Sequence, residues 1–255
     1  MASDDVNFRT RANDQQKPTP ENQNVYTPSR ASRYGELFVQ PLPNAYHALA
    51  NEGSYWYAHN AINDAATTLA GHAAPVLADA DSTMTKPLVF IRVPTGATKR
   101  VFLHFIELDV VTAPTGATTD NWAAQLDSGP TRWSSGGSAL TFANPNMQNA
   151  DASILNATNA LLAGAVVVGA ETANVRDLGF GQIRSGIPII GDRYVFRFGG
   201  DVDAVGSVVA TAASRHVIQL PPVVLGAQDQ FLLAHYGPSW SAAAIYKLRM
   251  GWVER

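Results

Sequence analysis

The strongest constraint on the fold lies in residues 221–255, where apolar side chains recur in two runs. The run 230–236 (Q-F-L-L-A-H-Y) is closed by a Gly-Pro-Ser break, and the run 244–253 follows it. In the second run every second position holds a large apolar residue: Tyr246, Leu248, Met250 and Trp252. Side chains of a strand point alternately to its two faces, so this period predicts a strand with one buried face. We interpret both runs as long β-strands.

Short apolar runs separated by Gly and Pro turns continue through most of the chain. We interpret these as further strands: 34–40, 54–60, 87–93, 99–112, 122–126, 175–184, 194–198 and 214–220. The segment 154–168 has a helical composition at its start, but its β-branched end favours a strand. No 3.6-residue period is sustained anywhere. The pattern predicts an all-β fold, an antiparallel β-sandwich of jelly-roll type.

The run 99–112 changes its apolar phase in the middle. The apolar positions are first Val101, Leu103 and Phe105, and then Ile106, Leu108 and Val110. A slip of one residue would turn every later side chain to the other face of the strand, unless an extra residue is left unpaired. The sequence therefore predicts a β-bulge near Phe105.

Residues 1–33 form a polar segment with three prolines and few large apolar side chains. Such a segment buries too little surface to offset its ordering entropy, so we expect an extended, disordered N-terminal arm before a sandwich domain of residues 34–255. One interpretation is a free tail. The other is an arm that docks on a neighbouring subunit, with Phe8 and Tyr26 as anchors.

Residues 128–150 are rich in Gly, Ser, Asn and Pro and predict a long surface excursion. Trp133 lies within it, and we expect this side chain to contact a partner. Trp133 also belongs to a set of aromatic residues that could line a sugar-binding face, with Trp56, Trp122, Trp240, Tyr55, Tyr57 and Tyr236. Such residues more often fill the core or a subunit contact, so a surface glycan is kept only as an alternative partner.

The charge of the chain excludes several classes of partner. The net charge is −3, so no basic field indicates binding to nucleic acid or to an anionic membrane. Charged residues make up 15% of the chain, against about 25% in typical proteins, which suits a surface covered by neighbours. No apolar export segment follows Met1, and we expect synthesis in the cytoplasm.

The residues that carry chemistry form no recognisable motif. The chain has no cysteine, and its six histidines show no metal-binding spacing. Glu107 and Asp109 lie two residues apart on one face of a strand, which could fit a glycosidase but is equally typical of a solvated face. We therefore expect no catalytic site, no cofactor and no metal.

Several sequence blocks resemble virion structural proteins of tailed bacteriophages. These blocks are 34–39 (Y-G-E-L-F-V), 47–55 (H-A-L-A-N-E-G-S-Y), 99–103 (K-R-V-F-L), 221–226 (P-P-V-V-L-G), 237–239 (G-P-S) and 251–255 (G-W-V-E-R). The resemblance covers most of residues 34–255 and not the arm, and its motifs belong to the scaffold.

The resemblance implies a non-enzymatic capsid decoration or cement protein on the exterior of the virion. Its implied partners are the major capsid protein and copies of itself, commonly as a homotrimer, without nucleic acid or membrane. The alternative is a receptor- or glycan-binding virion module, as a head fibre or a tail-associated protein. An enzyme that uses Glu107 and Asp109 is the third and weakest hypothesis.

Overall fold

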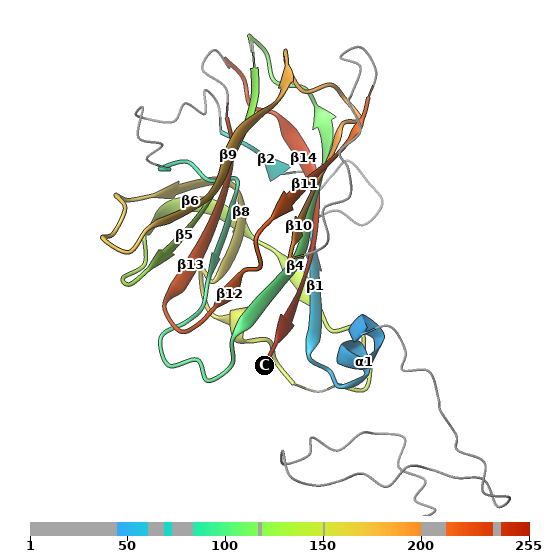
Figure 1. Ribbon diagram of the computed structural model, residues 1–255, viewed down its shortest axis with the longest axis vertical. Coiled ribbons are helices and arrows are strands. Elements are labelled where there is room, and N and C mark those ends of the chain that lie inside the picture. Colours follow the sequence, from blue (N-terminus) through green and yellow to red (C-terminus); the bar gives the residue numbers. More distant parts are fainter. Residues whose placement is uncertain are drawn as a thin grey trace, which may run out of the picture.

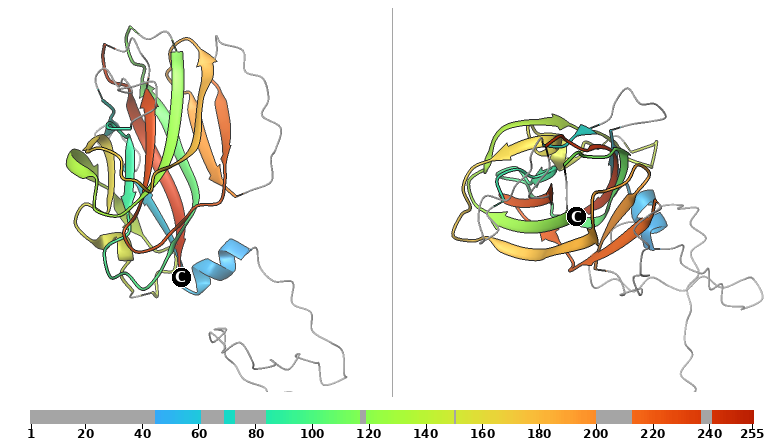
Figure 2. Two further views of the ribbon diagram at one scale, coloured as in Figure 1. Left: turned by 60° about the vertical axis from the view of Figure 1, so that its left-hand side comes forward. Right: turned by 90° about the horizontal axis from the view of Figure 1, so that it is seen from above.

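The computed structural model describes residues 45–60, 69–72, 84–116, 119–149, 151–199, 213–236 and 241–255. Its elements are strands with one short α-helix and one short 3-10 helix, arranged as two sheets that face each other (Figure 1). Figure 2 shows the two curved layers around a shared interior in the view from above. The predicted arm of residues 1–33 and the predicted strand at 34–40 lie outside the described residues.

The larger sheet is built around the long C-terminal strand. Its order is β11 (Arg215–Leu220), β10 (Arg193–Phe198), β4 (Val101–Thr112), β14 (Ile245–Glu254), β1 (Tyr55–His59) and β7 (Thr141–Ala143). Two short strands pair at its margins, β12 (Val224–Leu225) with β4 and β2 (Leu69–Ala70) with β14. Pairing is antiparallel except between β10 and β11.

The second sheet is antiparallel throughout. Its order is β6 (Trp133–Ala139), β8 (Leu161–Val168), β3 (Val89–Arg92), β13 (Asp229–Tyr236), β5 (Thr119–Ser128) and β9 (Arg176–Ser185). The two remaining elements are α1 (Ala45–Asn51) and a 3-10 helix (Ile154–Asn156) that precedes β8.

The structure confirms the antiparallel two-sheet architecture and both predicted C-terminal strands, which are β13 and β14. It also confirms the predicted β-bulge. Gly251 of β14 lies opposite Phe105 and Trp252 lies opposite Leu103, so His104 is the extra residue of β4. The bulge restores the inward direction of Ile106 and Leu108 after the phase change in the sequence.

Two sequence expectations need correction. The excursion 128–150 is not all loop, because it holds β6 and β7. Its Gly and Ser residues concealed β6, which bends at Gly136 and Gly137 in the left-handed region. The sequence analysis also missed α1, whose seven residues are too few to display a helical period.

The main core lies between the sheets and is assembled from alternate residues of their central strands. Tyr246, Leu248, Met250 and Trp252 of β14 are all 1% exposed or less. From the other sheet, Phe231 and Leu233 of β13 and Val89 and Ile91 of β3 point into the same core. Each large apolar side chain buried in this way contributes about 1.5–3 kcal/mol to folding.

The opposite face of the second sheet carries a smaller apolar cluster. Phe90 of β3 and Leu232 of β13 are fully buried there, together with Val166 of β8. Trp133 of β6 packs against this cluster and covers part of it. Both faces of the central strands β3 and β13 are therefore buried, which explains their nearly continuous apolar sequences.

A pair of glycines provides a matched test of the packing. A Cβ atom on Gly181 of β9 would meet no atom within 4 Å, whereas one on Gly136, with φ of +70°, would collide with the carbonyl oxygen of Ala165. We expect Gly181→Ala to raise the free energy of unfolding by about 0.5–1 kcal/mol. We expect Gly136→Ala to lower it by more than about 1–2 kcal/mol, since the backbone conformation disfavours a side chain. Urea denaturation measures both; equal effects would contradict this packing.

Candidate functional site

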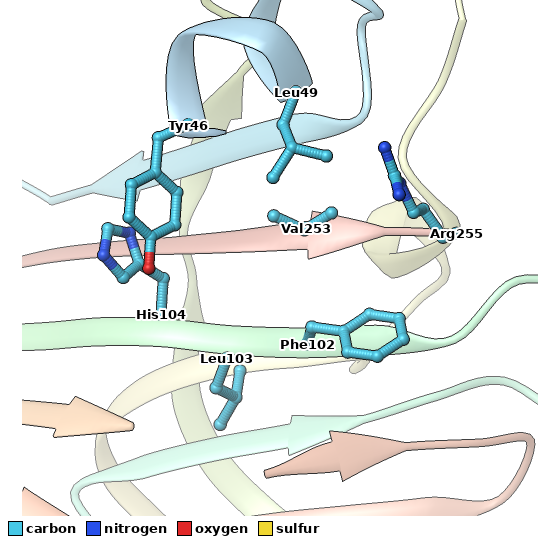
Figure 3. A pocket seen from close by; sticks show the side chains of 7 residues that line it. All are labelled: Tyr46, Leu49, Phe102, Leu103, His104, Val253 and Arg255. Atoms are coloured by element: carbon cyan, nitrogen blue, oxygen red, sulfur yellow. The ribbon is translucent and has the colours of Figure 1, made fainter. Parts of the chain in front are cut away.

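An apolar depression of about 310 Å³ opens at the end of the larger sheet where α1 lies beside the end of β14 (Figures 2 and 3). We name it the aromatic hollow and define it by its lining residues: Tyr46, Leu49, Phe102, Leu103, His104, Val253 and Arg255. Tyr46 and Leu49 come from α1, Phe102, Leu103 and His104 come from β4, and Val253 and Arg255 come from the end of β14 and the residue after it. In Figure 3 the side chains of α1 face the sheet across the opening.

The bulge in β4 places aromatic side chains close together on the outer face of the sheet. Phe102 lies opposite Val253 of β14, and Phe105 lies opposite Gly251. The extra residue, His104, stands between them. In a regular strand only every second residue would face outward, so the bulge adds an outward ring at this end of β4.

The imidazole ring of His104 is held by two tyrosines. Tyr46 stacks on it with ring centroids 3.8 Å apart and an angle of 17°, and a hydrogen bond of 2.9 Å joins Tyr55 Oη to His104 Nδ1. Burial, and then the nearby charge of Arg197, lower the pKa of His104. Burial and Tyr46 raise the pKa of Tyr55 to about 12. The side chains of His104 and Tyr55 are therefore uncharged at neutral pH.

A glycine next to the hollow allows two aromatic rings to lie against the backbone. Gly251 lies beneath the rings of Tyr55 and Phe105, and a Cβ atom there would stand 2.7 Å from Phe105 Cε1 and collide with Tyr55 Oη. The two rings approach the backbone because this residue has no side chain. The sequence block 251–255 thus contains one residue whose size the aromatic cluster requires.

Apolar surface extends beyond the hollow itself. Tyr46 is 42% exposed, Phe102 is 37% exposed, and Val224 of the neighbouring β12 is 43% exposed. Val224 lies directly opposite Phe102 in the sheet, so these exposed side chains are adjacent. Single exposed apolar residues are ordinary, but a contiguous group around a depression is typical of an interaction site.

The rim of the hollow is positively charged. Arg255 lines it and pairs with Glu52 at 2.6 Å, while the exposed Arg100 exchanges backbone hydrogen bonds with Arg255. Arg197 of β10 lies opposite Phe105 and is exposed. Across the described part of the chain, no ion pair involves Arg100 or Arg197. The rim therefore offers cations to an acidic ligand.

Glu107 and Asp109 lie farther along the outer face of β4, within a lattice of surface ion pairs. Glu107 contacts Arg249 at 2.8 Å and Arg193 at 3.1 Å. Arg193 also contacts Asp109 at 2.7 Å. Exposed pairs of this kind contribute about 0–1 kcal/mol each. The geometry matches a solvated, charge-paired strand face, and both carboxylates are engaged with arginines.

A second polar cluster is sealed between the two sheets. His235 Nε2 lies 2.7 Å from Asp120 Oδ1, and Tyr194 Oη donates to Asp120 Oδ2 at 2.6 Å. His235 Nδ1 bonds to the hydroxyl of Tyr246. The cluster joins two strands of each sheet, and its residues are at most 4% exposed. A substrate could not reach these buried side chains. Their hydrogen bonds therefore serve to hold the two sheets together.

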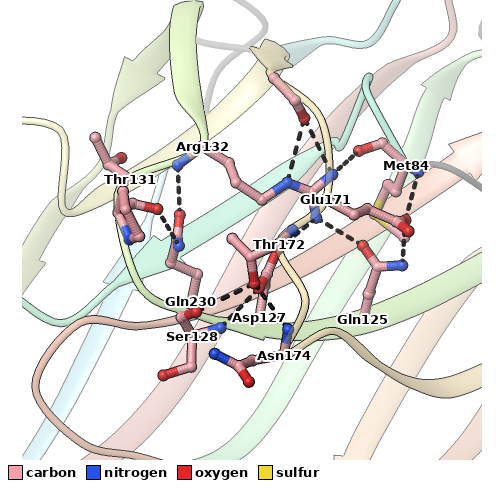
Figure 4. A network of polar contacts seen from close by, with 12 residues as sticks. Met84, Gln125, Asp127, Ser128, Thr131, Arg132, Glu171, Thr172, Asn174 and Gln230 are labelled. Carbon is pink, nitrogen blue, oxygen red and sulfur yellow. Dashed lines mark hydrogen bonds and ion pairs between the residues drawn. The ribbon is translucent and has the colours of Figure 1, made fainter.

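A third polar group anchors the start of β6 (Figure 4). The buried guanidinium of Arg132 donates to Gln125 at 2.8 Å, to Asp127 at 3.2 Å and to the carbonyl oxygen of Met84 at 2.7 Å. The backbone N–H of Arg132 donates to Gln230 Oε1 at 2.8 Å. These bonds position the next residue, Trp133, against the smaller apolar cluster.

Of the three predicted contact residues, the structure describes Trp133 alone, and it places this residue away from the hollow. Trp133 lies on the second sheet, is half-buried, and donates from Nε1 to the carbonyl oxygen of Gly136 at 3.1 Å. Phe8 and Tyr26 lie outside the described residues. Trp56 and Trp122 are 5% and 3% exposed, so they belong to the core and cannot line a sugar-binding face. The expectation that these two tryptophans line a sugar-binding face is therefore wrong.

No motif in the sequence marks the residues of the hollow as a site. Two signals pointed to their neighbourhood: the phase change near Phe105, and the block 47–55 that spans the end of α1 and the start of β1. Neither signal could show that residues from three distant segments meet at one end of the sheet.

Within the ranges the structure describes, no three His, Asp or Glu side chains lie close enough together to hold a metal ion. No helix in those ranges has the length and apolar character needed to cross a membrane. Comparisons with models of protein families, with curated protein sequences and with solved structures find no match to this chain.

The cluster between the sheets predicts a pH dependence of stability. Burial lowers the pKa of His235 below its ordinary 6.5, so below that pH the unfolded chain binds a proton that the folded chain excludes. Stability should therefore fall as the pH falls below 6.5. His235→Gln keeps an amide that can reach Asp120 in place of Nε2, and it cannot titrate.

We expect the loss of unfolding free energy between pH 7.5 and 5.5 to be smaller in His235→Gln than in the natural chain, by on the order of 1 kcal/mol. His47→Gln, at an exposed histidine, should leave the loss unchanged. Urea denaturation at the two pH values measures this. An identical loss in all three proteins would show that His235 is not excluded from protonation in the folded state.

Proposed function

We propose that this chain is a non-enzymatic structural protein of a tailed-phage virion, which decorates the capsid and stabilises the head through contacts between subunits. The observation that carries the proposal is the exposed apolar surface around the aromatic hollow, next to the point where residues 1–44 join α1. The resemblance of its sequence blocks to virion proteins supports the same conclusion. The major capsid protein and further copies of this chain, as a homotrimer, are the proposed partners.

The strand order supports the finer proposal of a jelly-roll sandwich. We number β1, β3, β4, β5, β9, β10, β13 and β14 from one to eight in chain order. One sheet then contains the sequence of neighbours one-eight-three-six, and the other contains two-seven-four-five. Two interlocked Greek keys in a jelly roll produce this order, with β2, β6, β7, β8, β11 and β12 as additions.

The surface chemistry also supports attachment to other proteins. The hollow combines apolar walls with a polar, positively charged rim, which is the arrangement of a protein–protein contact. The low share of charged residues suits a protein with much of its surface in such contacts. In the virion, an arm of residues 1–33 could order on a neighbour and cover a large area there.

The receptor- or glycan-binding alternative retains only Trp133 among the described tryptophans of the proposed sugar face. This side chain is half-buried and stands on the second sheet, away from the hollow. An effect of Trp133→Ala on adsorption of phage to its host would favour the alternative. An unchanged adsorption would remove the support that Trp133 gives to the alternative.

Removal of residues 1–33 tests the proposed function. The truncated chain should keep the circular dichroism spectrum and the cooperative unfolding of the full chain, since the core lies between the sheets. Its affinity for purified expanded capsids should fall at least tenfold in co-sedimentation.

Normal capsid binding by the truncated chain would eliminate the role of the arm. Failure of the full chain to sediment with capsids would contradict the decoration function itself.

A further inference from the structure

A second cavity, of about 210 Å³, lies between the two sheets on the side where β9 and β11 form their edges. Its walls are residues of β5, β9, β10, β11 and β13. Apart from Gln219, these residues are glycines or have aliphatic or aromatic side chains. An engineered apolar cavity of about 150 Å³ holds one benzene molecule. The cavity between β9 and β11 is therefore large enough for a small molecule with one aromatic ring.

Two glycines of β9 lie at the walls of this cavity. Gly179 lies opposite Ala124 and Gly181 lies opposite Trp122 in the ladder between β9 and β5. Residues directly opposite each other in an antiparallel pair share one face of the sheet. Because Ala124 and Trp122 belong to the main core, both glycines occupy inward positions where a core side chain would ordinarily stand.

The two glycines differ in what a side chain would meet. A Cβ atom on Gly179 would stand 3.2 Å from Leu220 Cδ2, so the packing of β11 against β9 accounts for this glycine. A Cβ atom on Gly181 would meet no described atom within 4 Å. A glycine inside a strand often marks the close approach of a ligand or of another backbone. Since no described backbone approaches Gly181, the space beside it favours a ligand.

Trp122 supplies an unused hydrogen-bond donor at this cavity. Its side chain lines the cavity and is 3% exposed, and its indole Nε1 has no acceptor among the described residues. The ring is held in place by stacking on His235, with ring centroids 3.9 Å apart. A buried donor without an acceptor destabilises a folded protein, so such groups are rare. An acceptor atom inside the cavity would remove this cost.

A water molecule is a poor partner for this indole N–H. A buried water ordinarily makes about three hydrogen bonds to polar groups. Besides the indole, the one polar side chain among the lining residues is that of Gln219, which is half-buried. A molecule with one acceptor oxygen and an otherwise apolar body would satisfy the indole and also fill the apolar part of the cavity.

We propose that this cavity is a binding site for a small aromatic molecule that carries one acceptor oxygen, such as an aryl ketone. The oxygen accepts a hydrogen bond from Trp122 Nε1, and the aromatic ring lies in the space beside Gly181. The ligand would bridge β9 and β11, the edge strands of the two sheets. This site is separate from the aromatic hollow and from the proposed attachment to capsids.

Two probes of nearly the same shape test the hydrogen bond in the isolated full chain. Acetophenone carries a carbonyl oxygen where cumene carries a methyl group. The chain is isotope-labelled in its tryptophans, and the indole N–H signals are followed by NMR during titration with each probe. The signal that is missing from Trp122→Phe belongs to Trp122. We expect acetophenone to bind with a dissociation constant of about 1 mM or lower. It should move the Trp122 signal downfield, and cumene should not.

Two substitutions separate the hydrogen bond from the shape of the cavity. Trp122→Phe should lower the affinity for acetophenone, relative to that for cumene, at least about fivefold, because only acetophenone loses a hydrogen bond. Trp133→Phe, at a tryptophan outside the cavity, should leave this ratio unchanged.

Gly181→Leu places a side chain in the cavity and should lower the affinity for both probes at least about tenfold. Gly169→Leu, at an exposed glycine that does not line the cavity, should leave both affinities unchanged. Circular dichroism and urea denaturation confirm the folding of each variant.

Three results would overturn the proposal. No binding of either probe to the natural chain would show that the cavity is not a ligand site. An unchanged ratio of affinities in Trp122→Phe would show that the indole N–H does not contact the ligand. Full affinity in Gly181→Leu would show that the probes bind elsewhere. Because the titrations contain no capsid, their failure is distinguishable from failure to bind capsids.

Discussion

The antiparallel ladder between β4 and β14 determines both the core and the outer surface of this protein. It lies at the centre of the larger sheet, and its inward residues supply the most deeply buried side chains. At one point the ladder accommodates an extra residue, His104, opposite the step from Gly251 to Trp252. Removal of His104 would move the side chains at one end of β4 to the opposite face of the sheet. Either the core or the aromatic hollow would then lose its side chains.

The buried polar groups complement this ladder by fixing how the layers sit on each other. Asp120, Tyr194, His235 and Tyr246 bond across the interior, and the Arg132 group secures β6 to the second sheet. Removal of one partner from such a group leaves another buried and unpaired, which costs more than an exposed contact would. The two sheets are thus joined by directional bonds as well as by apolar packing.

Much of the scaffold could be predicted because its information is local. The alternation in 244–253 identified β14, and the phase change in 99–112 identified the bulge, since both follow from the period of a strand. The helix α1 was missed because seven residues show no period. In β6, tertiary pairing with β8 overrides the turn character of Gly136 and Gly137.

The hollow could not be predicted because it joins side chains from residues 46–49, 102–104 and 253–255. Only the sheet register and the docking of α1 bring these segments together. Neither feature is determined by the sequence of a single segment. Exposure was equally hidden. Two of the three described tryptophans that suggested a binding face are core residues, while Phe105, in phase with the buried Val101 and Leu103 in the sequence, is half-buried on the outer face.

The central claim is that this chain associates with copies of itself through an arm and an exposed aromatic hollow. The mass of the full-length protein in solution, measured by light scattering over a range of concentrations, tests it most directly. The account predicts a closed oligomer, with about 80 kDa for a trimer of 27.2 kDa chains. A mass of one chain at every concentration would contradict it.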